Sequence, residues 1–473
     1  MSDTETIKRL EAVFNTQKKA QSESGATDYA TRIDRLNRLL DMVMETETQL
    51  LDAMDKDFGG RCHMLSMGLD LVAVVMELKQ ARKRLKKWMR AEKRSVNSPL
   101  GLTGAKARLV REPKGVIGNM VTWNFPLNLA LAPVVGIFAG GNRAILKMNE
   151  LSPELTRVLG EAIAERFDES EFALVGGGAE VSMAFTALPF DHIIFTGSTN
   201  VGKMVMAAAA NNLTPVTLEL GGKCPVVVSR TADPDKVATR VIYGKMTNAG
   251  QICLAPDYLL VPEEMTEELI KKMVAGCKQM LPNAVENQDY TAIINSGHYQ
   301  RLMGLLSDAK NKGAKITCVD AQSSDAGAAI KKIPLHILQN VSSDMTILQE
   351  EIFGPLLPLI PYQHFDDAID YLQGRDKPLA SYYFGRDTAE LDKILKFVPS
   401  GATTVNDTLF HALQHDLPFG GVGASGMGSY HGKAGFDEFT HPRAVYTQGW
   451  FDVGGLLRPP FKSRHKKILR RMM

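Results

Sequence analysis

Apolar positions follow two different patterns along the 473 residues of the chain. Over residues 1–100 they recur at helical spacing in long runs, at about 29–55 and 67–94, which predicts amphipathic helices. From Ala107 onward, short apolar runs alternate with helix-length segments. Strands that alternate with helices are typical of parallel α/β architecture. The runs predicted as strands are Val116–Thr122, Ala144–Lys147, Phe172–Val175, His192–Thr196, Val216–Leu220, Pro225–Val228 and those near 256–261, 356–360, 380–384 and 401–405.

These runs fall into two groups, which predicts two α/β lobes that meet near Gly221-Gly222. Residues 115–142 carry no charge, which raises the question of a membrane span. Pro126, Pro133 and four asparagines interrupt this stretch, so it cannot form one continuous helix in lipid. We expect a buried strand, a loop and a helix there instead.

Charge and cysteine usage exclude several classes of protein. Lys and Arg number 55 and Asp and Glu 53, so no overall field attracts nucleic acid. The five cysteines have no CxxC spacing, which argues against a disulfide framework or a zinc ribbon and favours the reducing cytoplasm. The N-terminus has no apolar signal region.

The last thirteen residues, 461–473, contain six Lys or Arg and no acid. They are too short and too basic for a transmembrane anchor. We expect a mobile, solvated end, with weak contact to acidic lipid headgroups or another polyanion as the alternative.

A glycine turn that follows an apolar strand is the first candidate site. In the segment Asp191–Lys203, the sequence GSTNVGK predicts a tight turn and a helix start, where backbone N–H groups favour a phosphate. The spacing nearly matches the phosphate-binding pattern GxxxxGK[ST]. Met204 stands where Ser or Thr would hold magnesium, which argues against a nucleotide triphosphatase. An ordinary strand–helix turn remains the alternative.

A glutamate and a cysteine are candidates for acid–base and nucleophilic chemistry. Glu219 ends an apolar strand before Gly221-Gly222, where loss of water would raise the pKa of its carboxyl group toward that of a general base. Cys253 lies in a loop of small residues after the helical run Pro234–Met246. Backbone amides in such a loop would lower the thiol pKa and bind an oxyanion. A structural glutamate and a packed thiol remain the alternatives.

Two further segments carry polar groups next to apolar ones. Asn124 follows a buried strand and must find hydrogen-bond partners or serve as a donor toward a substrate. Glu351 and Phe353 lie two positions apart, where they could hold a ribose hydroxyl and cover a flat ring.

Taken together, these segments resemble the NAD(P)-dependent aldehyde dehydrogenase superfamily. Seven motifs occur in the order of that family over residues 105–445, and Glu219 and Cys253 stand 34 residues apart, as is typical of it. The run Pro418–Gly432 is similar to the class 3 branch, which includes fatty, aromatic and coniferyl aldehyde dehydrogenases; the bacterial coniferyl type is the expected one. The motifs are TWNFP, LKMNE, FTGSTNVG, LELGGK, GQIC, EEIFGP and PFGG.

The resemblance implies oxidation of an aldehyde to a carboxylic acid through a hemithioacetal and a thioester on Cys253, without a metal. It implies that Asn124 holds the oxyanion and that Glu219 activates water. Glu150 would repel a 2′-phosphate, which favours NAD over NADP, with use of both cofactors as the alternative. The implied cofactor-binding residues are Trp123, Lys147, Glu150, Gly197, Ser198, Thr199, Val201, Gly202, Leu220, Glu351 and Phe353.

The resemblance also implies an architecture of two Rossmann-like lobes with parallel sheets and a small β bridging element. The expected divisions are an NAD-binding domain at 1–220 with a bridging hairpin at about 101–117, a catalytic domain at 221–420, a return segment with an oligomerisation strand at 421–460, and the basic tail at 461–473. A homodimer is implied, with edge strands near 105–112 and 440–447 as candidates for contact.

Departures from the family pattern concern the substrate. The region expected near the aldehyde entrance, Cys62–Met67, carries methionines, and His411 and His415 are candidates for the pocket rim or for surface positions. Three other functions remain as alternatives: a cofactor-independent thiol esterase, a phosphotransferase that uses the GSTNVGK turn, and a polyanion-binding protein that uses the tail.

Overall fold

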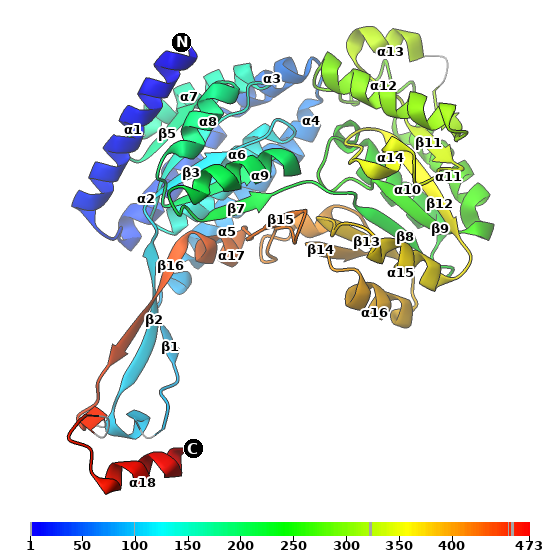
Figure 1. The fold of residues 1–473 in the computed structure, drawn as a ribbon. Coiled ribbons are helices and arrows are strands. Elements are labelled where there is room, and N and C mark those ends of the chain that lie inside the picture. Colours follow the sequence, from blue (N-terminus) through cyan, green and yellow to red (C-terminus); the bar gives the residue numbers. More distant parts are fainter. Residues whose placement is uncertain (1, 99, 321–323, 453, 456–457) are drawn as a thin grey trace.

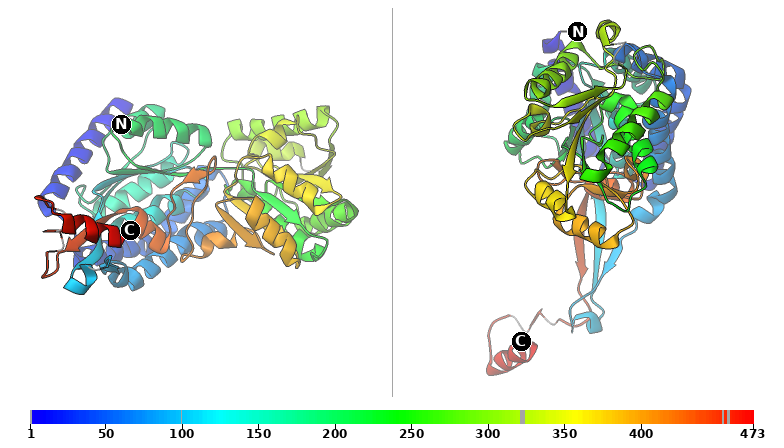
Figure 2. Two further views of the ribbon diagram at one scale, coloured as in Figure 1. Left: turned by 60° about the horizontal axis from the view of Figure 1, so that its bottom comes forward. Right: turned by 90° about the vertical axis from the view of Figure 1, so that its right-hand side faces the viewer.

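Three β-sheets organise the chain (Figure 1). The structure is a computed structural model that describes residues 2–98, 100–320, 324–452, 454–455 and 458–473. Two larger sheets each form the centre of one lobe, and a three-stranded sheet projects from the first lobe as an arm (Figures 1 and 2). The predicted α/β fold with two lobes of parallel strands and a small β element is therefore confirmed.

The sheet of the first lobe has six strands in the order β15-β7-β6-β3-β4-β5. All neighbours in it are parallel except β15 and β7. Its strands are β3 (Val116–Met120), β4 (Arg143–Lys147), β5 (Phe172–Val175), β6 (His192–Thr196), β7 (Val216–Glu219) and β15 (Gly426–Met427).

The sheet of the second lobe has seven strands in the order β10-β11-β12-β9-β8-β13-β14, and only β10 runs antiparallel to its neighbour. The chain crosses from the first sheet to the second between Glu219 and Pro225, so the Gly221-Gly222 pair lies in the connection. Its strands are β8 (Pro225–Val228), β9 (Tyr258–Pro262), β10 (Lys315–Cys318), β11 (His336–Gln339), β12 (Leu356–Tyr362), β13 (Ala380–Phe384) and β14 (Ala402–Val405).

The third sheet is antiparallel, in the order β1 (Glu92–Arg94), β2 (Lys106–Pro113) and β16 (Thr440–Thr447). The hairpin therefore begins at Glu92 rather than near residue 101. Segment 105–112 is also not an edge, because β2 lies between β1 and β16. The exposed edges of the arm are β1 and β16.

Helices cover both faces of each large sheet (Figure 1). The first lobe carries α1 (Asp3–Ser24), α2 (Tyr29–Glu45), α3 (Glu47–Phe58), α4 (His63–Ser66), α5 (Val72–Trp88), α6 (Pro126–Ala139), α7 (Pro153–Arg166), α8 (Ala179–Ala187), α9 (Thr199–Ala210) and α17 (Gly432–Glu438). The second carries α10 (Pro234–Met246), α11 (Thr266–Met280), α12 (Ser296–Asn311), α13 (Ser324–Ile330), α14 (Thr346–Gln349), α15 (Phe365–Gln373) and α16 (Thr388–Phe397).

Alternation along the buried strands explains why the first sheet needs helices on both faces. Val116 and Ile193 pack in one apolar cluster with α1, α8 and α9, whereas Ile117 and Ile194 pack in another with α2, α5, α6 and α7. Successive side chains of a strand point to opposite faces, so two neighbours that are both apolar require two cores. The uncharged stretch 115–142 forms a buried strand, a loop and a buried helix, as expected.

One helical prediction needs correction. The run 67–94 begins with a π-helical turn (Met67–Leu71), continues as α5 and ends at Trp88, before β1. The basic tail contains α18 (Ser463–Met472), which lies at the tip of the arm (Figures 1 and 2). No described helix is both long and apolar enough to cross a bilayer.

A buried ion pair connects the N-terminal helices to the loop that enters α6. Arg61 and Asp70 are both fully buried, and Arg61 Nη2 donates to Asp70 Oδ2 at 2.6 Å. Arg61 Nη1 also donates to the carbonyl oxygen of Asn124 at 2.9 Å, and Asp70 Oδ1 accepts from the Asn128 N–H at 3.1 Å. The pair thus holds both sides of the turn that carries Asn124.

We expect Asp70→Ala to lower the free energy of unfolding by about 3–5 kcal/mol, because it leaves the Arg61 guanidinium buried without a counter-charge. Chemical denaturation measures the change. Asp52→Ala is the control, since Asp52 is an exposed partner of His63, and it should leave the midpoint unchanged. An Asp70→Ala variant as stable as the wild type would contradict this role for the pair.

Candidate active site

The polar segments singled out in the sequence meet at one edge of the first sheet. The carboxyl ends of parallel strands share an edge, and ligands bind there in open α/β sheets. The turn after β3 carries Asn124, the turn after β6 carries Gly197 and Ser198, and β7 ends at Glu219. This edge faces the second lobe, from which Cys253 and Glu351 join the same cavity.

The loop that carries Cys253 starts with an unusual backbone turn. After α10, three consecutive residues have positive φ: Asn248 (50°), Ala249 (52°) and Gly250 (72°). A Cβ atom on Gly250 would lie 2.4 Å from the carbonyl oxygen of Gly354. Left-handed backbone is costly for alanine, so the surrounding contacts must hold this turn in place.

Buried amide side chains supply those contacts and cross between the lobes. Gln251 Nε2 donates to the carbonyl oxygens of Asn248 at 3.0 Å and Ala292 at 3.1 Å, and its Oε1 accepts from the Ile294 N–H at 3.0 Å. Asn248 Nδ2 donates to the carbonyl oxygens of Asn124 at 3.0 Å and Gln251 at 3.1 Å. We call Arg61, Asp70, Asn124, Asn248 and Gln251 the inter-lobe network.

Cys253 lies where two cavities meet. The first, of about 720 Å³, we call the cofactor cavity, and the second, of about 820 Å³, the substrate cavity; Cys253 lines both. The cofactor cavity is lined by Thr122, Trp123, Asn124, Thr196, Gly197, Ser198, Glu219, Leu220, Gly221, Cys253, His298, Arg301, Glu351 and Phe353. A group in either cavity can therefore approach the same sulfur atom.

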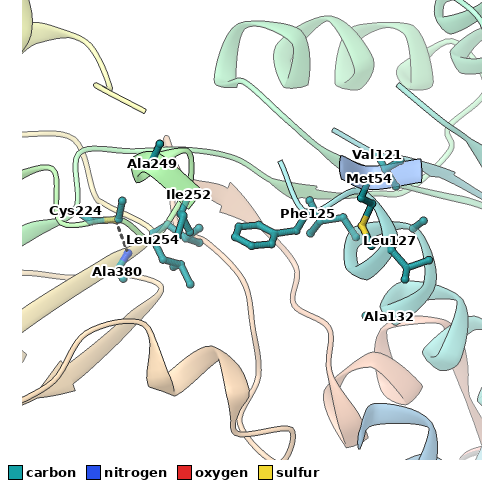
Figure 3. Packing of buried hydrophobic residues seen from close by; sticks show 14 of the residues in the cluster. Met54, Val121, Phe125, Leu127, Ala132, Cys224, Ala249, Ile252, Leu254 and Ala380 are labelled. Atoms are coloured by element: carbon teal, nitrogen blue, oxygen red, sulfur yellow. Dashed lines mark hydrogen bonds between the residues drawn. The ribbon is translucent and has the colours of Figure 1, made fainter. Parts of the chain in front are cut away.

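The walls of the substrate cavity are mainly apolar and come from both lobes. Figure 3 shows Phe125 of the first lobe pointing toward Ile252 and Leu254 of the second. The remaining lining residues are Leu69, Ala73, Glu77, Asn128, Leu129, Ala132, Tyr243, Cys253, Leu409, Phe410, Ala412, Leu413, His415, Phe419, Tyr430 and His431.

Two sequence expectations about this entrance are revised. The helix that lines the cavity contributes Leu69, Ala73 and Glu77, and none of the residues in Cys62–Met67 takes part. His415 lines the cavity, whereas the ring of His411 lies 6.3 Å from that of Tyr382 and outside the lining. The pKa of His411 is lowered to about 4 by burial.

Glycines shape the cofactor cavity at the start of α9. A Cβ atom on Gly197 would lie 2.5 Å from the Phe195 ring, and one on Gly202 would lie 2.6 Å from Leu220. Ser198 caps the helix, and its hydroxyl accepts from the Val201 N–H at 3.4 Å. The turn therefore brings bare backbone and a helix N-terminus to the cavity, as a pyrophosphate requires.

Aromatic rings and a buried carboxylate complete this cavity. The Trp123 ring lies 5.4 Å from Phe353 and 5.1 Å from His298. Glu351 Oε1 is buried without a hydrogen-bond partner among the described residues, and a Cβ on Gly221 would clash with this carboxylate. An orphaned acceptor beside flat rings and a glycine turn fits a dinucleotide with ribose hydroxyls.

The other predicted cofactor residues, Lys147, Glu150, Thr199, Val201 and Gly202, do not line this cavity. Lys147 ends β4 and donates to the Gly177 carbonyl oxygen at 2.7 Å, with Glu150 Oε2 at 3.9 Å from its ammonium group. Glu150 is exposed, Val201 is exposed on α9, and Gly202 is buried against Leu220. Thr199 lines a neighbouring polar cleft with Lys203, Lys223, Arg375 and Lys377.

Sequence reasoning missed His298 and Arg301, which enter the cofactor cavity from α12. Arg301 Nη2 donates to the Ile352 carbonyl oxygen at 2.5 Å and so fixes the segment that presents Glu351 and Phe353. The only signal in the sequence was that His298 and Arg301 are three residues apart, which places them on the same face of a helix. It did not single out this helix, because such pairs are common on helix surfaces.

The electrostatics of Cys253 differ from the expectation. Burial of the thiol, followed by the nearby carboxylates of Glu351 and Glu219, raises its pKa well above the ordinary value. The backbone amides of the loop act in the opposite direction but are weaker. The lowering that was predicted for the backbone amides is present, but loss of water outweighs it, so the net shift of the thiol pKa is upward.

Glu219 behaves as expected. It is buried, both carboxylate oxygens lack hydrogen-bond partners among the described residues, and burial raises its pKa well above the ordinary value. Burial likewise raises the pKa of Glu351 to about 8. Both groups can therefore hold a proton near neutral pH.

Asn124 lines the cofactor cavity and is buried. Its Nδ2 donates to the Gln251 carbonyl oxygen at 3.2 Å, which fixes the orientation of the amide. A carboxamide nitrogen carries two N–H groups, so one remains for a ligand. Asn124 thus combines a place in the inter-lobe network with a free donor in the cofactor cavity.

Comparisons with known proteins agree with this geometry. Residues 3–445 match the profile of the aldehyde dehydrogenase family. The coniferyl aldehyde dehydrogenase of Pseudomonas sp. (strain HR199 / DSM 7063) is 46% identical over 455 residues, which cover 96% of this chain and 94% of that protein. The aldehyde dehydrogenase family 3 member B3 of Mus musculus is 37% identical over 469 residues, which cover 98% of this chain and 94% of that protein.

A solved structure described as a substrate-bound state of Staphylococcus aureus AldH is similar with a TM-score of 0.91 and 36% identity, over 98% of this chain and 99% of that one. Together, the profile, the two relatives and this structure confirm the resemblance that the seven ordered motifs indicated.

We expect alkylation of Cys253 by iodoacetamide to be slow at pH 7 and to rise through the alkaline range, because burial disfavours the thiolate. Glu351 becomes charged above its pKa of about 8 and opposes the thiolate further. Glu351→Gln should therefore increase the rate of alkylation above pH 8. Glu350→Gln, which changes an exposed neighbouring residue, is the control and should leave the rate unchanged. Peptide mass spectrometry measures the alkylated fraction of Cys253 over time. An alkylation rate that levels off below pH 8 would contradict the raised pKa of the thiol.

Proposed function

Because the chain belongs to the aldehyde dehydrogenase family, we propose that it oxidises an aromatic, coniferyl-type aldehyde with NAD, using Cys253 as nucleophile, Asn124 as oxyanion donor and Glu219 as base. Membership of the family makes the chain an NAD(P)-dependent aldehyde dehydrogenase. The observation that carries the residue assignment is the position of the Cys253 thiol, which lines both cavities.

The substrate proposal rests on the shape and chemistry of the substrate cavity. Five aromatic side chains, those of Phe125, Tyr243, Phe410, Phe419 and Tyr430, are among its walls, and flat apolar surfaces favour a flat apolar substrate. The name of the Pseudomonas relative supports the coniferyl type. A medium- or long-chain aldehyde is the second candidate, since an apolar wall accepts alkyl chains as well.

In the proposed mechanism the Cys253 thiol passes its proton to solvent, and its sulfur bonds to the aldehyde carbon. The oxyanion that forms accepts hydrogen bonds from the second N–H of Asn124 Nδ2 and from a backbone N–H near Cys253. A bound nicotinamide ring would supply the oxidation as a hydride acceptor, and the acyl group would then remain on Cys253 as a thioester. Trp123 and Phe353 would hold the ring, and Glu351 the ribose beside it.

Glu219 is the proposed general base for hydrolysis of the thioester, which releases the carboxylic acid. Its carboxylate takes a proton from water, the water oxygen bonds to the thioester carbon, and the carbon–sulfur bond breaks to return the Cys253 thiolate. A carboxylate with a raised pKa is a stronger base than an exposed one, and the buried position of Glu219 raises its pKa.

The pyrophosphate of the cofactor would lie against Gly197, Ser198 and Thr199, with Val201, Gly202 and Leu220 shaping that turn. Lys147 and Glu150 would hold the adenosine ribose. We propose NAD over NADP because the Glu150 carboxylate is unfavourable for a 2′-phosphate.

Assembly, domain divisions and compartment are further parts of the proposal. We propose a homodimer that uses the edge strands of the arm, and divisions at 1–220, 221–420, 421–460 and 461–473. The few cysteines favour the reducing cytoplasm.

The alternatives have less support. A thiol esterase needs a histidine that activates Cys253, and among the described residues no hydrogen bond joins Cys253 to a histidine. A phosphotransferase would need a magnesium ligand at Met204, whose side chain is exposed and apolar. Polyanion binding by the basic helix α18 stays open beside the enzyme activity.

Oxidation of a panel of aldehydes, followed by NADH absorbance, tests the proposal. We expect aromatic enals to be oxidised with higher kcat/KM than alkanals, and Cys253→Ala to lower kcat/KM by roughly 10³-fold or more. Cys318→Ala is the matched control and should retain activity. Cofactor-independent ester cleavage in place of aldehyde oxidation, or an active Cys253→Ala variant, would refute the assignment.

Replacement of Glu150 tests the cofactor preference. Glu150→Ala removes the charge proposed to oppose a 2′-phosphate, so we expect kcat/KM for NADP to rise roughly twofold to fivefold at this exposed position. Glu154→Ala, which removes a half-buried carboxylate at the start of α7, serves as the control. A wild-type enzyme with equal KM values for NAD and NADP would contradict the preference.

A further inference from the structure

The substrate cavity contains an acidic side chain that the proposed mechanism does not use. Glu77, on α5, lines the cavity and is only 2% exposed. Its neighbours in the lining are mostly apolar, with His415 and His431 beside it. A carboxylate in such a wall costs desolvation energy unless it receives hydrogen bonds.

Among the described residues, only one of its two oxygens accepts a hydrogen bond. Oε1 accepts from the Gly432 N–H at 2.6 Å. Oε2 lies 2.9 Å from His415 Nδ1, within ion-pair distance, and both atoms are buried without a hydrogen-bond partner among the described residues. One acceptor and one imidazole nitrogen therefore remain side by side in the cavity wall.

The surrounding backbone holds this pair in a fixed place. Gly432 has φ of 47°, and a Cβ on it would lie 2.2 Å from the His415 carbonyl oxygen, so the two loop segments are in close contact. The His431 ring packs 4.6 Å from Tyr430 and 5.1 Å from Phe419. Burial lowers the pKa of His431 to about 4, which keeps this ring neutral at pH 7.

The pair is separate from the reacting groups but within their electrostatic reach. Tyr430 lines the same cavity, and its pKa is raised by burial and then by Glu219, Cys253 and Glu77 together. Neither Glu77 nor His415 is hydrogen-bonded to Cys253 or Glu219 among the described residues. A polar group that meets Glu77 therefore belongs to the body of the substrate and not to its carbonyl.

We propose that Glu77 and His415 form a recognition site for a phenolic hydroxyl on the aromatic aldehyde. This inference rests on the aromatic substrate proposed above and specifies its polar substituent. The hydroxyl donates to Glu77 Oε2, and its oxygen can accept from His415 Nδ1. The flat walls then hold the ring, so the substrate class is hydroxylated aromatic aldehydes.

This arrangement distinguishes a hydroxyl group from its methyl ether. A phenol can donate to the carboxylate, whereas an ether has no hydrogen to donate and leaves the carboxylate unpaired. The test compares 4-hydroxycinnamaldehyde, 4-methoxycinnamaldehyde and cinnamaldehyde. For the wild type we expect kcat/KM of the hydroxy compound to exceed that of each of the others by at least roughly tenfold.

We expect the variant Glu77→Gln to change the ratio of kcat/KM between the hydroxy and the methoxy compound. Its amide oxygen must accept from the Gly432 N–H, so its NH₂ group occupies the position of Oε2. That group donates to an ether oxygen as well as to a phenol oxygen. We therefore expect the hydroxy-to-methoxy ratio to fall to roughly threefold or less.

Gln80→Leu is the matched control. Gln80 lies one turn further along α5, with Nε2 3.5 Å from Asp416 Oδ1, and does not line the cavity. This variant should keep the wild-type ratio. If Glu77→Gln does not fold, the wild-type comparison of the three aldehydes and a His415→Gln variant still decide the matter.

The outcomes separate this inference from the proposed function. A wild type that oxidises all three cinnamaldehydes equally well, or an unchanged ratio in Glu77→Gln, would overturn the hydroxyl site and leave the aromatic proposal standing. A preference for alkanals over every cinnamaldehyde would overturn the aromatic proposal itself. A preference for an aminoaldehyde would assign Glu77 to a cation instead, and so overturn the hydroxyl site.

Discussion

The active site depends on the buried polar network that crosses between the lobes. Asn124 comes from the first lobe, Asn248 and Gln251 come from the second, and their amides exchange hydrogen bonds with backbone carbonyl oxygens at 3.0–3.2 Å. The Arg61–Asp70 pair anchors the same turn from the N-terminal helices. Buried amides that lose a partner are costly, so the network fixes the two lobes in one register and holds the left-handed turn before Cys253.

A buried junction has an electrostatic consequence. The thiol of Cys253 and the carboxyl groups of Glu219 and Glu351 all lose water, and all three have raised pKa values. The resting site therefore favours neutral groups, and charge that develops during the reaction must be stabilised by donors already in place, such as the Asn124 amide. This is why the same network that joins the lobes also supports the proposed chemistry.

Much of this architecture could be predicted from sequence, because buried parallel strands are continuous apolar runs. β5, β6, β8 and β13 match the predicted runs residue for residue. β10 was not predicted, since Lys315 and Thr317 interrupt its apolar pattern at the edge of a sheet, and β1 is a strand of charged residues whose stability comes from its pairing with β2. Propensity alone does not reveal strands that depend on a neighbour.

The residues of the candidate site also divide into those that the sequence indicated and those that it did not. Cys253, Glu219 and Asn124 stood out because a short motif surrounds each of them. Glu77 and Arg301 did not, because they reach the cavities only through the packing of helices far apart in the chain. The direction of the Cys253 pKa shift was also missed, since burial is a property of the folded structure and not of the loop sequence.

The central claim is that aldehyde chemistry takes place on Cys253, where the two cavities meet. Mass spectrometry of peptides from a Glu219→Gln enzyme, quenched within its first turnover with NAD and an aromatic aldehyde, tests it most directly. We expect the acyl group on the peptide that contains Cys253, in a larger fraction than in the wild type. NADH formation without an acyl group on Cys253, or with the acyl group on another residue, would contradict the account.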